Sequence, residues 1–171
     1  KPVNDRQVVL SILFATGFTS MAMEMVWTRA FTPVLRTTIY AFASILAAYL
    51  LATWIGSWIY RKHAGRKEVI DTAYLITCLS CFSLLPLILN DPGILRMLFG
   101  GNGRARIIAV ILSIFPFCCA LGYMTSKLVD EFSQGDPRDA GKAYAFNSIG
   151  CILGPLFSGY FLLPALGIRF A

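Results

Sequence analysis

Charged residues are scarce in this chain. Only 14% of its 171 residues are charged, whereas 57% are hydrophobic. A soluble globular domain carries about a quarter charged residues. The shortage therefore excludes a soluble domain and favours an integral membrane protein.

Residues that carry catalytic or metal chemistry are equally few. The chain has one histidine, and its five cysteines all fall inside apolar runs. A free cysteine there behaves as a small hydrophobic residue, and a zinc site needs about four converging ligands. We therefore predict no metal, no cofactor and no catalytic site within these residues.

Long apolar stretches are plentiful. They cover residues 7–28, 39–60, 72–89, 106–127 and 143–168, and each is near the ~20 residues that a ~30 Å hydrocarbon core requires. The sequence predicts an all-α, polytopic membrane helix bundle of about five transmembrane helices, forming one domain over residues 1–171. Because the chain begins with Lys1 and stops just after an apolar run, we expect it to be a fragment of a longer polypeptide.

The connections between these stretches predict an orientation. Nine of the 15 Lys and Arg residues fall on one side of the membrane, including every lysine and the densest cluster, Arg61, Lys62, Arg66 and Lys67. Cytoplasmic loops carry the excess of Lys and Arg, so we place the N-terminus and this loop in the cytoplasm. The cations are expected to contact anionic lipid headgroups, and His63 in the same loop is expected to be solvated.

Small residues recur on one face of the last apolar stretch. Gly150, Gly154 and Ser158 are four residues apart, and small residues at this spacing let helices approach closely in lipid. Pro155 removes a backbone hydrogen bond and should bend the helix. We interpret the face as a packing surface; a second interpretation is a sliding surface between moving halves.

The second apolar stretch carries a similar face, formed by Ala48, Ala52 and Gly56. The same argument predicts close helix packing there. An alternative partner for this face is another chain of a larger membrane complex.

Three polar residues are candidates for binding a substrate or an ion: Glu24, Arg29 and Asn147. A carboxylate at membrane depth costs a few kcal/mol, so it normally faces a partner or a watery cavity. Glu24 could lie at the membrane surface if the helix ends early, or pair with Arg29 or Arg36, or carry a proton or a substrate cation. Asn147 is expected chiefly to hydrogen-bond a neighbouring helix.

Two of these motifs are similar to motifs of the major facilitator superfamily. Residues 56–67 resemble the loop motif between its second and third helices, with Tyr60 in place of an acidic residue and two extra residues before Gly65. Residues 150–159 resemble its glycine–proline motif, with Ser158 in place of a glycine. The resemblance implies a major-facilitator-like arrangement of helices.

Most of the chain resembles the bacterial fused transporter-like/spermidine synthase proteins. The resemblance rests on four segments, namely residues 23–29, 40–44, 144–150 and 163–167. In that family a membrane region precedes a Rossmann-like aminopropyltransferase domain that binds decarboxylated S-adenosylmethionine and a polyamine. No such soluble domain is present in these residues, so the enzyme activity does not carry over to them.

Three functions follow as hypotheses. The chain could be the N-terminal inner-membrane domain of a spermidine-synthase-like protein, anchoring or supplying substrate to a cytoplasmic enzyme domain. It could instead be half of a small-molecule transporter of major facilitator type, or a structural subunit of a larger membrane complex. The expected partners are the lipid bilayer and a downstream or separate enzyme domain or other membrane subunits. Nucleic acid is not expected, because the basic residues sit in short loops between apolar runs.

Overall fold

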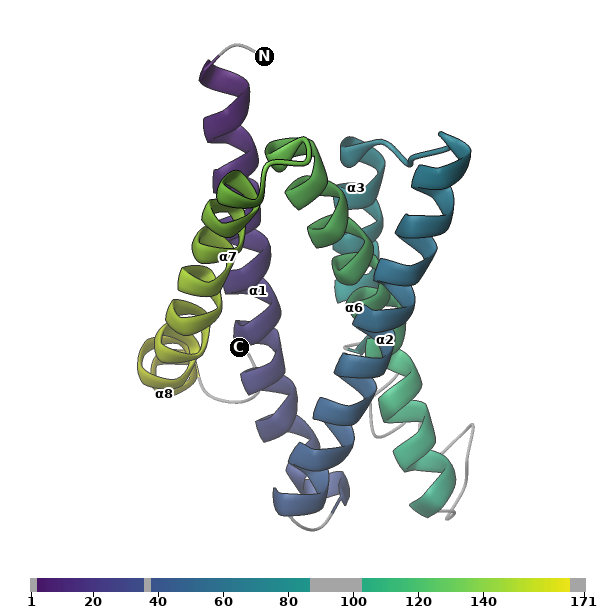
Figure 1. The fold of residues 1–171 in the computed structure, drawn as a ribbon. Helices are drawn as coiled ribbons and strands as arrows, with labels where there is room; N and C mark the ends of the chain where they lie inside the picture. Colours follow the sequence, from purple (N-terminus) through teal and green to yellow (C-terminus); the bar gives the residue numbers. More distant parts are fainter. Residues whose placement is uncertain (1–2, 36–37, 87–102, 167–171) are drawn as a thin grey trace. The chain divides into compact units, whose positions relative to one another are not determined.

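The computed structural model describes residues 3–35, 38–86 and 103–166, which form helices joined by short connections (Figure 1). No strand occurs among these residues, and the predicted all-α class is confirmed. The helices are α1 (Val3–Leu35), α2 (Thr38–Arg66), α3 (Thr72–Ser83), α6 (Gly103–Ser133), α7 (Pro137–Phe157), the π-helical η1 (Ser158–Leu162) and α8 (Leu163–Leu166).

Four helical segments are long and apolar enough to cross a membrane: Arg6–Arg29, Phe42–Arg66, Ile111–Ser133 and Pro137–Ala165. The third predicted span, residues 72–89, differs from them. Its described helix, α3, has 12 residues and is about 18 Å long, against a hydrocarbon core of ~30 Å. Residues 87–89 of that prediction lie outside the described residues. The described helices therefore supply four of the five predicted spans, and the third predicted span stays a prediction.

The helices group into two compact units. The first comprises Lys1–Ala30 and Thr125–Ala171, and the second comprises Phe31–Met124. Helix α6 contributes to both, because its last turns belong to the first unit. The sequence predicts one domain, and each unit is described below by itself.

In the first unit, α1 and α7 lie side by side (Figure 1). Their N-terminal ends are on the same side, because the Arg6 guanidinium forms an ion pair with Asp139 at the start of α7. The same guanidinium lies 4.6 Å from the centre of the Phe132 ring at the end of α6. Arg6 thus joins the ends of three helices, and Lys142 adds a second cation 2.9 Å from the Asp139 carboxylate.

A tight turn brings α7 back from α6. Gln134 and Gly135 both have positive φ angles, a region that costs most residues but not glycine. Asp136 then begins α7, since its side chain accepts a hydrogen bond from the Arg138 N–H at 2.9 Å, and Pro137 occupies the first helical position. The cap satisfies one of the otherwise unpaired amides at the helix start.

In the second unit, α2 and α6 make backbone contact through glycines. A Cβ at Gly56 would lie 1.9 Å from the Cys119 carbonyl oxygen, and a Cβ at Gly122 would lie 2.2 Å from that of Thr53. The Ser57 hydroxyl also donates to the Gly122 carbonyl at 3.2 Å. Such contacts are possible only where side chains are absent, which is how small residues bring membrane helices together.

Ala48 and Ala52 extend the face that Gly56 begins on α2. Both are buried, at 7% and 0% exposure. The predicted small-residue face is therefore covered within the chain, which leaves it unavailable to another subunit in this conformation.

Candidate functional site

The candidate site lies where α1 and α7 cross in the first unit. A Cβ at Gly150 would lie 2.2 Å from the Phe14 carbonyl oxygen, and one at Gly154 would lie 2.3 Å from that of Phe18. These separations bring the two backbones into direct contact. Polar side chains on either helix near the crossing are consequently shielded from lipid.

A row of polar residues on α1 occupies this shielded region. Thr16, Ser20 and Glu24 recur every four residues and are 9%, 4% and 8% exposed, respectively. Residues four apart share a helix face. Asn147 and Cys151 on α7 lie against the same region, and we call these five residues the polar seam.

Hydrogen bonds tie the members of the polar seam to one another and to the backbone. The Thr16 and Ser20 hydroxyls donate to carbonyl oxygens of their own helix at 2.9 Å. The Asn147 amide donates to the Cys151 sulfur at 3.9 Å. Ser20 and Glu24 on α1 both lie near the Cys151 thiol. The row on α1 and the pair on α7 therefore form one connected site.

Asn147 also fixes the approach of the helices. A Cβ at Gly17 would meet the Asn147 carbonyl oxygen at 2.2 Å and its side-chain oxygen at 2.8 Å. Gly17 therefore makes room for the asparagine.

Glu24 is the one acidic member of the polar seam. Helix α1 continues to Leu35, so Glu24 is not at the end of the helix, and its low exposure places it inside the unit. Among the described residues, no ion pair reaches its carboxylate. The predicted early end of the helix is therefore wrong, and the depth of Glu24 in the membrane stays a prediction.

Arg29 does not join the site. Its side chain is exposed, and five residues along a helix correspond to a rotation of about 140° away from Glu24. The predicted pair between Glu24 and Arg29 is consequently not formed. The alternative partner, Arg36, lies outside the described residues.

The arrangement can hold a proton or a small cation. An ionised carboxylate at membrane depth costs about 2.5–3.5 kcal/mol on insertion scales, and a bound proton or cation removes that cost. The remaining groups are an amide, two hydroxyls and a thiol. In the described part of the chain, no group of three or more His, Cys, Asp or Glu residues could hold a metal ion.

Ser158, the last residue of the predicted packing face, is fully buried. Its hydroxyl donates to the Pro155 carbonyl at 3.3 Å. It begins η1, in which the helix widens just after Pro155. A proline lacks the amide hydrogen that the helical turn before it needs, and Pro164 follows η1 directly after Leu163, which accounts for the irregular turn there.

The basic cluster at the end of α2 lies in the second unit. Arg61, Lys62, Arg66 and Lys67 are all exposed. The first three lie in the last turns of α2, which ends at Arg66, so the prediction that the cluster is a loop is wrong for them. Lys67 has a positive φ of 58°, and the Glu68 N–H donates to the His63 carbonyl at 3.0 Å. The two features form a Schellman end to the helix.

His63 is not solvated as predicted. It is half-buried, and its Nδ1 lies 3.2 Å from the Tyr123 hydroxyl of α6. The Tyr123 oxygen also accepts a hydrogen bond from the Ile70 N–H at 3.1 Å. Tyr123 therefore anchors the basic loop, a role that sequence alone does not indicate because the two residues are 60 positions apart.

Comparison of the chain with protein-family models, curated proteins and solved structures finds no match.

Proposed function

We propose that this chain is the membrane-embedded domain of a spermidine-synthase-like protein of the bacterial inner membrane. In this proposal it anchors a cytoplasmic enzyme domain and presents a small cationic substrate to it. The cation binds at the polar seam, where Glu24 supplies the negative charge and Asn147 supplies hydrogen bonds.

The proposal is carried by the burial of the Glu24 carboxylate without an ion-pair partner among the described residues. The carboxylate is 8% exposed and has no cationic partner among the described side chains. Ionisable residues at membrane depth usually serve a substrate or ion pathway, because placing a charge in the bilayer costs free energy that no structural role requires. A cationic substrate is the natural complement of such a group.

Replacing Glu24 with glutamine tests this role. We expect Glu24→Gln to abolish transfer of the cation, measured as uptake or as activity of the downstream enzyme, while the amount of protein in the membrane is unchanged. Glu68→Gln is the matched control, because Glu68 is an exposed carboxylate outside the polar seam. Normal transfer by Glu24→Gln would count against the proposal.

The proposal also fixes an orientation with the N-terminus in the cytoplasm. Arg6 and the turn between α6 and α7 are on one side because Arg6 contacts Asp139, which agrees with the expected alternation of loops. A cysteine introduced at Gly65 should resist an impermeant thiol reagent on intact cells and react after lysis. Labelling on intact cells would contradict the proposed orientation and place the N-terminus outside the cytoplasm.

A transporter half or a structural subunit is the second candidate. Only 22% of the apolar window is buried in α1, in α2 and in α7, against 56% in α6. Fewer than a quarter of the residues in each of these three windows are buried within the chain, so lipid or further helices could cover the remainder. Retained enzyme activity after replacement of the whole region by an unrelated anchor would favour simple anchoring over both transport and substrate presentation.

A further inference from the structure

One face of α2 stays exposed along most of the helix. Leu50, Trp54 and Trp58 are 57%, 59% and 45% exposed, and Lys62 continues the row four residues later. Arg61 lies beside Lys62 and is exposed as well. Steps of three and four residues keep these side chains on one side of a helix. We call these five residues the α2 stripe.

The α2 stripe changes character along its length. It is aliphatic at Leu50, aromatic at Trp54 and Trp58, and cationic from Arg61 onward. Tryptophan rings favour the headgroup level of a bilayer. The Lys62 ammonium lies 3.8 Å from the centre of the Trp58 ring, a cation–π contact. The order reproduces that of a phospholipid, from acyl chain to charged headgroup.

The cations at this end form no ion pair within the part of the chain that the structure describes. None of the ion pairs among the described residues involves Arg61, Lys62, Arg66 or Lys67. Two acidic residues follow in the connection to α3. Asp71 accepts a hydrogen bond from the Thr72 N–H at 2.8 Å, which commits one of its oxygens to starting that helix, and Glu68 is exposed.

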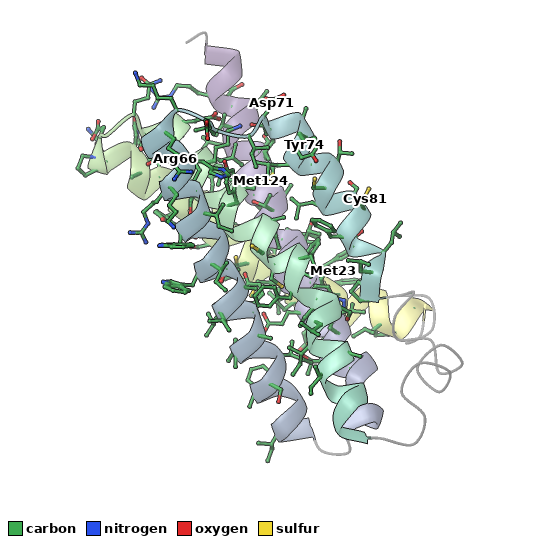
Figure 2. The ribbon with its side chains drawn as sticks, turned by 90° about the vertical axis from the view of Figure 1, so that its right-hand side faces the viewer. Met23, Arg66, Asp71, Tyr74, Cys81 and Met124 are labelled. Atoms are coloured by element: carbon green, nitrogen blue, oxygen red, sulfur yellow. The ribbon has the colours of Figure 1, made fainter. Side chains whose placement is uncertain are left out.

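The cluster keeps a positive balance even with both acids counted, with four cations against two carboxylates. Figure 2 shows Arg66 and Asp71 near the same end of the second unit, with Tyr74 and Cys81 following along α3. The backbone at the end of α2 contributes carbonyls, because it is a helix C-terminus, whereas the amides at the start of α3 lie beside the Asp71 carboxylate that caps them. Affinity for an anion must therefore come from the side chains.

We propose that the α2 stripe, together with Arg66, is a binding site for one anionic phospholipid. Arg61, Lys62 and Arg66 hold the headgroup phosphate, and the acyl chains lie along Trp54 and Leu50. The apolar half of the α2 stripe favours a phospholipid over a soluble anion, because a soluble anion has no acyl chain to contact it. The proposal does not depend on the function of the polar seam.

The test compares an anionic lipid with a neutral one of the same chain length. The purified protein is placed in nanodiscs of phosphatidylcholine that contain a small fraction of phosphatidylglycerol, with the chains of either lipid brominated. We expect brominated phosphatidylglycerol to quench tryptophan fluorescence more strongly than brominated phosphatidylcholine at equal fraction. Trp54 and Trp58 report the contact, whereas Trp27 is 4% exposed and contributes an unquenched background.

A double variant, Lys62→Gln with Arg66→Gln, should remove the preference. A cation near an anionic lipid surface changes binding by about fivefold, so we expect the preference for phosphatidylglycerol to fall by about fivefold to 25-fold. The matched control is Arg29→Gln with Arg138→Gln, which removes two exposed arginines outside the stripe and should leave the preference unchanged.

Native mass spectrometry of the same proteins provides an independent measurement. It counts the phosphatidylglycerol molecules that each protein retains, and this count does not depend on tryptophan fluorescence. Equal loss in the double variant and the control would show that net charge alone attracts the lipid, and would overturn the proposal. Equal quenching by the two brominated lipids in the unaltered protein would also overturn it.

Discussion

Replacing Gly56 with alanine is expected to lower the free energy of unfolding by about 1–3 kcal/mol. The added methyl carbon would lie 1.9 Å from the Cys119 carbonyl oxygen and 2.9 Å from the Tyr123 amide nitrogen. Both atoms belong to backbone, so no side chain can rotate away, and α2 and α6 must move apart. The separation also weakens the Ser57 hydrogen bond to Gly122.

The matched control is Gly141→Ala in α7. A Cβ at Gly141 meets nothing within 4 Å, and alanine in an exposed helix is favoured over glycine by about 0.5–1 kcal/mol. The control should therefore be as stable as the unaltered protein or slightly more so. Reversible unfolding in mixed detergent micelles, followed by circular dichroism, measures both variants. Equal stability of Gly56→Ala and Gly141→Ala would contradict the contact between α2 and α6.

The helices themselves could be predicted from the sequence. Apolar runs of about 20 residues leave a lipid-immersed chain little choice but a helix, because every backbone group must be paired internally. The same reasoning picked out Gly150 and Gly154, whose spacing indicates a packing face. It did not identify Gly17 or Gly122, because neither has another glycine four residues before or after it, and its importance depends on the partner helix.

The length of α3 was harder to predict. Composition alone extends the apolar run to residue 89, but the described helix ends at Ser83. Leu84 then follows as a turn, residues 85 and 86 are helical again, and the rest of the predicted span lies outside the described residues.

The candidate site could be predicted only in part. Glu24 and Asn147 are both members of the polar seam, whereas Arg29 is on another face of α1. The period of four that joins Thr16 and Ser20 to Glu24 was present in the sequence and is the signal that was overlooked. Cys151 could not be assigned to the site without the crossing of α1 and α7, since an isolated cysteine in an apolar run is normally a packing residue.

The second large effect is expected at Glu24. A carboxyl that is shielded from water and has no cation beside it is most simply kept neutral by a proton. When a small cation enters the polar seam, the carboxyl should release that proton and become the counter-charge. For each single ammonium group that sits against the carboxylate, the exchange leaves the local charge unchanged, which is why it is favourable at membrane depth.

Proton release on cation binding tests this central claim most directly. Spermidine is added to the purified protein in weakly buffered nanodiscs at neutral pH, and a pH-sensitive dye counts the protons. We predict release of about one proton per chain, no release from Glu24→Gln, and unaltered release from Glu68→Gln. Equal release from the unaltered protein and Glu24→Gln, or none from either, would contradict the account.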